Sequence, residues 1–279
     1  MIALDSVKDL RVLMVGDAIM DAYRYVRVVG KAVKEAALST VLEKVELFRG
    51  GVWAAAEHVR ALGCQRVAIM SGPNVMWNTR MVESVYLRKL IVEHDLRLNQ
   101  RTEFDFHIPD FDLVIVTDFG HGTMTKQLIE RVTREARYLA VNTQTNATNY
   151  GFNLITKYPR ADFVVLDELE ARLATHDDKS PIEEVILELG LRNVIITMGK
   201  NGAVGFDGAF ERQGSLTEQI IDTMGAGDAF FCVAAPFASI GASMRDLVKI
   251  GNAAGAIKCG IVGHRAAVDR TTLGEYLNG

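Results

Sequence analysis

Six short segments recur along the chain, and each is nearly continuous in Val, Ile, Leu and Met. Runs of this kind are typical of strands that are covered on both faces of a parallel sheet. The predicted strands occupy residues 11–17, 66–72, 112–118, 138–143, 162–167 and 193–199. Segments with helical spacing lie between and after them, at residues 53–62, 124–136, 168–175, 181–190, 227–240, 243–260 and 271–277. The alternation predicts an α/β fold with three α/β/α layers around a doubly wound, mostly parallel sheet.

Two stretches depart from this alternation. Residues 40–51, TVLEKVELFRGG, alternate apolar and polar side chains with a period of two, as a half-exposed strand does. Residues 84–96 are strand-like as well. We expect a small β-flap, or lid, that is formed from about residues 24–50 and about 80–97 and lies beside the main sheet. No internal repeat or long linker divides the chain, so we expect a single domain over residues 1–279.

Composition narrows the partners and the compartment. The chain has 279 residues, of which 49% are hydrophobic and 24% charged, and its net charge is −4. This balance gives no electrostatic reason for nucleic acid or an anionic membrane to be the main partner. The sequence has neither a signal-peptide pattern nor an apolar run long enough for a membrane span, so we expect a cytoplasmic protein. Cys64, Cys232 and Cys259 lie far apart in apolar surroundings, which indicates buried reduced thiols.

The segment DTMGAGDAFF, residues 222–231, carries the clearest chemistry. Gly225, Ala226 and Gly227 can present consecutive backbone N–H groups at the start of a helix, where an anion is favoured. Asp228 falls in the first turn of that helix and can accept a proton from a substrate hydroxyl. Phosphoryl transfer needs donors for the transferred oxygens and a base near the attacking oxygen. From these residues alone, a structural glycine-rich turn explains the segment equally well.

Two further clusters can bind a polar ligand. In GDAIMDAY, residues 16–23, the Asp21 carboxylate can accept hydrogen bonds from adjacent sugar hydroxyls, whereas Asp17 is better explained as a cap of the turn that follows it. Gly50 and Gly51 open an alanine-rich helix. Small residues there allow backbone amides to approach a ligand, or they only permit close packing of the helix on the sheet.

Two segments are candidates for a nucleotide and its metal. TMGKNGAV places Thr197, Gly199 and Gly202 in a loop after a strand, a weak pattern that can lie against a nucleotide. DELEARLA, residues 167–174, brings carboxylates to a strand–helix junction, where they either order waters around Mg²⁺ or cap the helix. The histidines lack the spacing of metal ligands, although His121 and His264 lie in glycine-rich loops.

Taken together, these motifs resemble one family. DTMGAGDAF resembles the C-terminal signature of the ribokinase-like (PfkB) carbohydrate kinases. VLMVGDAIMDAY, GGVWAAAEHVRALG, TMGKNGAV and NAAGAIKCGIVG are similar to other parts of that family, so the resemblance extends through most of the chain. GDxxxDxY and DFGHG are most similar to the heptose 7-phosphate kinase branch, whose members are often fused or paired with a nucleotidyltransferase.

The resemblance implies transfer of the γ-phosphoryl group of ATP to a hydroxyl of a sugar or sugar phosphate, with Mg²⁺ as cofactor. By the same resemblance, Asp228 is the base. The anion hole then consists of the backbone of Gly225, Ala226 and Gly227.

The resemblance also implies two binding sets and one residue near the metal. The sugar is assigned to Asp21, Gly50 and Gly51. The nucleotide is assigned to Thr197, Gly199, Gly202 and Asn252. Glu168 is expected to order the Mg²⁺ shell through water.

Three departures from the family pattern point to a changed sugar pocket. Val165 stands where the family usually has an Asn, and His121 stands where the heptose kinase branch commonly has a Lys. Only the short stretch that contains PNVMW separates RVAIMSG from TRMVESVYLRKL, whereas related kinases carry a further helix and strand between these two segments. Arg80, Arg88, Lys31 and Lys34 are the candidates to meet a substrate phosphate.

Two hypotheses of function follow. In the first, the chain is a sugar kinase, or a kinase of a nucleoside or another alcohol in the same family. In the second, it is a catalytically altered kinase fold that binds sugar or nucleotide as a regulatory module. Under either hypothesis we expect a homodimer, because exposed flap faces and edges favour a partner. A nucleotidyltransferase of the same pathway is a further expected partner.

Overall fold

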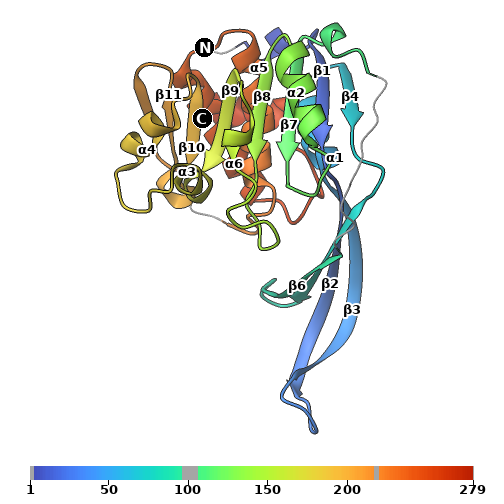
Figure 1. The fold of residues 1–279 in the computed structure, drawn as a ribbon. Helices are drawn as coiled ribbons and strands as arrows, with labels where there is room; N and C mark the ends of the chain where they lie inside the picture. Colours follow the sequence, from blue (N-terminus) through green and yellow to red (C-terminus); the bar gives the residue numbers. More distant parts are fainter. Residues whose placement is uncertain (1–2, 96–105, 217–219, 279) are drawn as a thin grey trace.

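The computed structural model describes residues 3–95, 106–216 and 220–278 (Figure 1). Its main sheet has eight strands in the order β12-β11-β10-β9-β8-β7-β1-β4, and those from β10 to β4 run parallel. β11 and β12 are antiparallel additions at one edge. The bounds are β1 Arg11–Gly16, β4 Arg66–Met70, β7 Leu113–Asp118, β8 Leu139–Thr143, β9 Phe163–Asp167, β10 Val194–Thr197, β11 Ala203–Phe206 and β12 Phe210–Gln213. Each of the six predicted apolar segments therefore contains one parallel strand.

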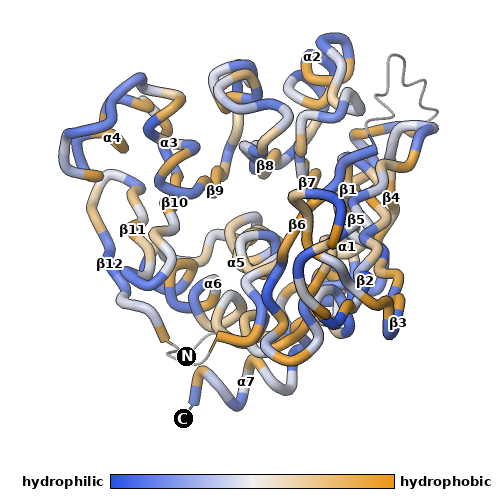
Figure 2. Tube along the Cα trace, turned by 90° about the horizontal axis from the view of Figure 1, so that it is seen from below, coloured by the Kyte–Doolittle hydropathy of each residue, from blue (hydrophilic) through white to orange (hydrophobic). Residues whose placement is uncertain are grey.

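Helices cover both faces of this sheet, as Figure 2 shows from below. α2, α3 and α4 lie on one face, and α1, α5, α6 and α7 lie on the other. Their bounds are α1 Val52–Ala61, α2 Lys126–Glu135, α3 Glu168–Thr175, α4 Ile182–Leu189, α5 Ala226–Ser239, α6 Met244–Cys259 and α7 Arg270–Asn278. The three-layer α/β/α prediction is confirmed.

The strands supply both apolar cores because successive side chains point to opposite faces. In β1, Val12 and Met14 pack with α1, α5 and α6, whereas Leu13 and Val15 pack in the core beneath α2, α3 and α4. All four side chains are fully buried. This two-sided burial explains why the strands are continuous in apolar residues rather than alternating.

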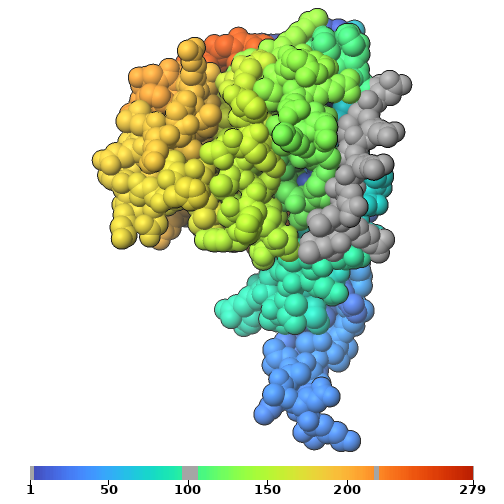
Figure 3. Space-filling model, viewed as in Figure 1, coloured from blue at the N-terminus to red at the C-terminus, as the bar shows by residue number. Residues whose placement is uncertain are grey.

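A second sheet of four strands, in the order β3-β2-β5-β6, forms the flap. Its strands are β2 Ala18–Lys31, β3 Leu38–Gly51, β5 Met76–Glu83 and β6 Lys89–Asp95. The antiparallel β2–β3 pair projects well beyond the main body (Figures 1 and 3). The flap strands overlap the predicted ranges of about 24–50 and about 80–97, but β2 begins at Ala18 and β5 at Met76, earlier than the prediction.

The predicted flap strand over residues 84–96 is wrong in its first part. Residues 84–88 form a turn, because the Glu83 side chain accepts hydrogen bonds from the N–H groups of Val85 and Tyr86. Leu87 also takes a positive φ of 55°. β6 therefore begins only at Lys89, and residues 96–97 of the predicted flap lie outside the described residues.

The short connection after β4 leads the chain directly into the flap. β4 ends at Met70 and β5 begins at Met76, where it pairs in parallel with β2.

Within the described part of the chain, no helix has the length and apolar character that crossing a bilayer requires.

Candidate active site

A cavity of about 340 Å³ lies between the flap and the carboxyl ends of β7, β8, β9 and β10. In open α/β sheets this edge is where ligands bind. The flap contributes Ile19, Asp21, Gly51, Asn78, Arg80 and His94. The residues after the strand ends and around the start of α5 contribute Phe119, His121, Asn142, Gln144, Thr145, Gly225, Gly227, Asp228 and His264 among others.

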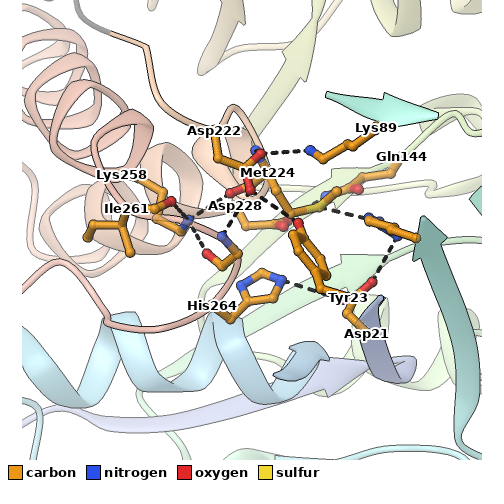
Figure 4. Close-up of polar contacts among 12 residues, drawn as sticks. Asp21, Tyr23, Lys89, Gln144, Asp222, Met224, Asp228, Lys258, Ile261 and His264 are labelled. Carbon is orange, nitrogen blue, oxygen red and sulfur yellow. Dashed lines mark hydrogen bonds and ion pairs between the residues drawn. The ribbon is translucent and has the colours of Figure 1, made fainter. Parts of the chain in front are cut away.

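Asp21 lies on the flap wall of this first cavity, opposite Asp228 on the body (Figure 4). Asp21 Oδ1 lies 3.1 Å from Nη1 of Arg80, and both side chains are buried. Asp21 Oδ2 lies 3.6 Å from Nε2 of His264. Tyr23, the residue paired with Arg80 across the β2–β5 ladder, packs its ring under the guanidinium. The flap thus holds one carboxylate and one guanidinium side by side at the cavity.

Several buried polar atoms around the cavity lack aligned partners among the described residues. They are Arg80 Nε, His121 Nδ1, Thr145 Oγ1 and His264 Nδ1, whereas Asp21 Oδ1 and Arg80 Nη1 have only their 3.1 Å ion pair with each other. All five residues line the cavity. A buried polar group without a hydrogen bond costs about 1–3 kcal/mol, so such groups are normally satisfied. Their concentration in one place indicates a cavity that is built for a polar ligand.

The two glycines at the end of β3 permit close approach rather than supplying contacts of their own. A Cβ on Gly50 would lie 2.3 Å from Oδ2 of Asp21, and one on Gly51 would lie 2.3 Å from the carbonyl oxygen of Asp17. Gly51 also has a φ of 58°, which favours glycine. Gly51 lines the cavity, whereas Gly50 lies directly behind the Asp21 carboxylate.

The sequence suggested that Asp17 caps the turn that follows it, but its side chain contacts a different loop. Its carboxylate accepts hydrogen bonds from the N–H groups of His121 and Thr123, at 3.2 and 3.1 Å. The residue therefore orders the DFGHG loop after β7, because β1 and β7 are neighbours in the sheet. This places the His121 ring at the cavity, and burial lowers the pKa of that ring.

The glycine loop before α5 follows the sequence prediction in its backbone conformation but not in all three predicted donors, because the N–H of Ala226 donates to the carbonyl oxygen of Thr223 at 3.2 Å. Gly225 precedes the helix with a φ of 72°, and α5 begins at Ala226. Asp228 falls in the first turn, is buried, and accepts a hydrogen bond from the Gln144 side chain. Burial raises the pKa of Asp228, while His264, Gln144 and Lys258 act in the opposite direction. A carboxylate with a raised pKa is a better proton acceptor than an ordinary aspartate.

A second cavity of about 270 Å³ lies on the other side of the glycine loop. It is lined by Thr197, Gly199, Gly202, Ala226, Gly227 and Asn252, and by apolar side chains that include Leu216, Ile220 and Phe230. All four residues assigned to the nucleotide from the sequence are thus brought together. Thr197 and Gly227 line both cavities, so the two spaces meet at the start of α5.

Of the two alternatives for the carboxylates at the start of α3, helix capping and ordering of Mg²⁺ waters, the structure shows capping for Asp167 and Glu170. Asp167 and Glu170 form a capping box, in which each side chain accepts the backbone N–H of the other at 2.8 Å. Glu168 instead pairs with Arg172 and lines a shallow surface cavity beside Thr197 and Gly199.

The described side chains offer few ligands for a metal ion. Within the described ranges, no group of three or more His, Cys, Asp or Glu side chains could hold a metal ion. Mg²⁺ in kinase sites is usually held by one or two carboxylates together with substrate phosphates and water. The position of Glu168 near the second cavity fits that sparse arrangement.

Four basic residues, Arg80, Arg88, Lys31 and Lys34, were candidates to meet a substrate phosphate. The structure brings only Arg80 of these four to the first cavity. Arg88 stacks on Tyr86, and Lys31 and Lys34 are exposed at the far end of the β2–β3 arm. Charge and flap position alone did not separate these residues, since the β2–β5 register decides which side chain faces inward.

Sequence reasoning missed Gln144 and Lys258. Gln144 directly follows β8, and the rule that polar residues after parallel strands gather at one edge would have identified it. Lys258 lies inside the apolar helix α6, where a lone lysine fully buried is rare without partners.

Known proteins resemble the chain in sequence and in fold. A bifunctional protein HldE from Wolinella succinogenes is 28% identical over 174 residues, which cover 60% of this chain and 36% of that protein. The chain thus spans little more than a third of the length of this relative.

Among solved structures, a ribokinase from Thermotoga maritima has a TM-score of 0.75 at 17% identity and covers 97% of this chain and 100% of its own. A ribokinase from Arabidopsis thaliana, solved with ribose and ATP, has a TM-score of 0.74 at 14% identity and covers 97% and 99%. At this identity the structures establish the fold, which is ribokinase-like. The family model described as pfkB family carbohydrate kinase matches residues 107–270, more than half of the chain. The chain therefore belongs to the pfkB family of carbohydrate kinases.

Proposed function

We propose that this chain transfers the γ-phosphoryl group of ATP to a hydroxyl of a sugar or sugar phosphate. The observation that carries the proposal is the meeting of two cavities at Gly227, with Asp228 in the wall of the first cavity. The second cavity suits a nucleotide whose base packs on its apolar side chains and whose phosphates are directed at the glycine loop. The first cavity, called the acceptor cavity from here on, suits a polar acceptor.

In this mechanism the oxygen of the acceptor hydroxyl bonds to the γ-phosphorus of ATP, the bond from that phosphorus to the β-phosphate oxygen breaks, and ADP leaves. Asp228 accepts the proton of the attacking hydroxyl. The N–H groups of Gly225 and Gly227, at the positive end of α5, stabilise the charge on the transferred oxygens, whereas the N–H of Ala226 donates to the carbonyl oxygen of Thr223 at 3.2 Å. Gln144 holds the Asp228 carboxylate in place through its hydrogen bond. Mg²⁺ bound to the nucleotide would neutralise phosphate charge, and Glu168 would contribute to its water shell.

The acceptor is polyhydroxylated in this proposal. Asp21 would accept hydrogen bonds from the acceptor's hydroxyls, with Gly50 leaving room for the carboxylate and Gly51 lining the cavity beside it. Arg80 supports a phosphorylated acceptor, since its buried guanidinium lines the cavity and its Nε has no hydrogen-bond partner among the described residues. The motifs shared with the heptose 7-phosphate kinase branch favour a heptose phosphate within this class. The curated relative is called bifunctional, which supports a nucleotidyltransferase as a partner in the same pathway.

The test is incubation with Mg·ATP and matched pairs of sugars and sugar phosphates, scored by ADP release. Turnover that Asp228→Asn abolishes supports the kinase. A preference for the phosphorylated member of a pair, lost in Arg80→Met, supports the acceptor class. Nucleotide binding without turnover on any acceptor, nucleosides included, would instead favour a regulatory module.

We also propose a homodimer that is formed through the flap. The projecting β2–β3 arm and β6 carry exposed apolar side chains, namely Val28, Val29, Leu38, Val41, Leu42, Val45, Leu47, Leu90, Ile91 and Val92. Exposed apolar side chains that are concentrated on projecting strands indicate an interaction site. Sedimentation at micromolar concentration tests the proposal, and a monomer there would contradict it.

A further inference from the structure

The Lys258 side chain is fully buried and makes a complete set of contacts with backbone oxygens (Figure 4). Its ammonium donates hydrogen bonds to the carbonyl oxygens of Gly263 at 2.6 Å, Met224 at 2.7 Å and Ile261 at 3.4 Å. A lysine ammonium has three N–H donors, so three acceptors match its capacity. Burial lowers the pKa of Lys258, but nearby Asp222 and Asp228 favour its charged form.

The contact with Met224 fixes the direction of the next peptide group. The described peptide bonds are all trans, and the N–H of a planar trans peptide points opposite to its carbonyl. The Met224 carbonyl points at Lys258, so the Gly225 N–H points away from it. A Cβ on Gly225 would lie 3.5 Å from Cε of Lys258 and 3.0 Å from Cε1 of His264, so these two side chains pack directly against Gly225.

Asp222 holds the other side of the same loop. Its carboxylate accepts the N–H of Met224 at 3.0 Å and the N–H of Gly263 at 2.9 Å. The residues before Gly225 and those after α6 are therefore joined twice. In the first link, the Asp222 carboxylate accepts hydrogen bonds from the N–H groups of Met224 and Gly263. In the second, the Lys258 ammonium donates hydrogen bonds to the carbonyl oxygens of the same two residues.

We propose that Lys258 is a positioning residue for phosphoryl transfer, whose ammonium aims the Gly225 N–H and the start of α5 at the transferred phosphoryl group. The inference rests on the proposed kinase activity and deepens it. Lys258 does not touch the nucleotide or the acceptor in this arrangement. It acts through the Met224–Gly225 peptide, and its positive charge lies behind the anion hole where negative charge develops.

The kinetic test compares Lys258→Met with Lys258→Ala. Methionine fills the same space without charge, and kcat is expected to fall about 100-fold, the scale of losing one oxyanion donor. KM for ATP and for the acceptor should change less than threefold. Alanine leaves a space bounded by three carbonyl oxygens. Added ammonium or potassium ions at millimolar concentration should therefore restore activity to Lys258→Ala but not to Lys258→Met.

Lys249→Met is the matched control, because Lys249 is on the same helix and exposed. It should retain the wild-type kcat. A Lys258→Met enzyme with wild-type kcat, or a Lys258→Ala enzyme whose lost activity no cation restores, would overturn the proposal.

A second readout does not depend on turnover, so it separates this inference from the proposed function. Hydrogen exchange of the amides in residues 222–228 should quicken at least tenfold in Lys258→Met relative to Lys249→Met. If the wild-type chain phosphorylates no acceptor while this difference is found, the positioning of the loop stands and the kinase assignment fails. Unchanged exchange in these amides would overturn the positioning role itself.

Discussion

Lys89 on the flap and Asp222 at the start of the glycine loop form an ion pair of 2.7 Å (Figure 4). The phenol of Tyr23, also on the flap, donates a hydrogen bond to the same carboxylate at 3.1 Å. Asp222 in turn accepts the N–H of Met224, immediately before Gly225. The flap, which forms one wall of the first cavity, is thus connected through one carboxylate to the loop that holds the phosphoryl group in the proposed function.

Replacing Lys89 with methionine should loosen this connection. We expect KM for the acceptor to rise about tenfold, because hydrogen bonds to charged groups contribute roughly 1.5–3 kcal/mol and this pair is partly exposed. The KM for ATP should stay within twofold, since Lys89 does not line the second cavity. Steady-state kinetics with each substrate varied in turn checks the split. Lys31→Met, an exposed lysine at the end of β2, is the control. Equal changes in both KM values would contradict the assignment.

Asp228→Asn tests the base. Loss of the proton acceptor should lower kcat by about 10²–10⁴-fold, while the affinity for ATP is nearly unchanged. Isothermal titration with ATP, run beside ADP-release kinetics, distinguishes lost chemistry from lost binding. The asparagine can keep one hydrogen bond with Gln144, so the fold should survive. A variant with a near-wild-type rate would exclude Asp228 as the base.

Gly50→Ala tests the carboxylate of Asp21 without changing it. The new methyl group would lie 2.3 Å from Asp21 Oδ2, so the carboxylate must move. We expect kcat/KM for the acceptor to fall at least tenfold and the affinity for ATP to be retained. Gly274→Ala serves for comparison, because its added Cβ meets only Leu4 at an ordinary 3.4 Å. If the two alanine variants behave alike, Asp21 does not bind the acceptor.

Glu170 predicts how stability depends on pH. Burial raises the pKa of Glu170 from 4.5 to about 8, so the folded chain binds a proton more tightly than the unfolded chain does. The stability that this proton contributes is complete below about pH 4.5 and is lost as the pH rises towards 8. Glu170→Gln keeps the capping box and removes the titration, so the wild-type Tm should fall relative to that of the variant between pH 5 and about pH 8.

The control for this experiment is Asp177→Asn. Hydrogen bonds from Ser180 and Lys179 lower the pKa of half-buried Asp177 to about 2, outside the same pH range. Its Tm should therefore stay parallel to that of the wild-type chain in scanning fluorimetry. Parallel curves for Glu170→Gln as well would show that Glu170 is already ionised at pH 5.

The main sheet and its helices could be predicted because their apolar residues are buried on both faces, and this leaves a clear pattern. The start of β2 could not. Its first residues, Ala18 and Ile19, are buried together, so the alternation that marks a flap strand is absent there. Only Asp17 separates β1 from β2, and GDAIMDAY therefore resembles a strand end followed by a turn.

The candidate site was predictable where one segment carries a whole motif, as in the glycine loop and Asp228. It was not predictable where partners come from distant segments. Arg80 meets Asp21 only because Tyr23 and Arg80 are paired in the β2–β5 register. Lys258 reaches Met224 only because α6 packs beside the start of α5. Neither register nor helix packing leaves a pattern in the spacing of the residues.

Among the described residues, the first cavity, proposed for the acceptor, and the second cavity, proposed for the nucleotide, share only Thr197 and Gly227. The flap strands β2, β5 and β6 contribute to the acceptor wall and to none of the nucleotide wall. Substitutions in the flap can therefore alter which alcohol is accepted while the affinity for the phosphoryl donor is inherited unchanged. A chimaera that exchanges residues 18–51 and 76–95 with those of another member of the family should carry the acceptor preference of the flap's source.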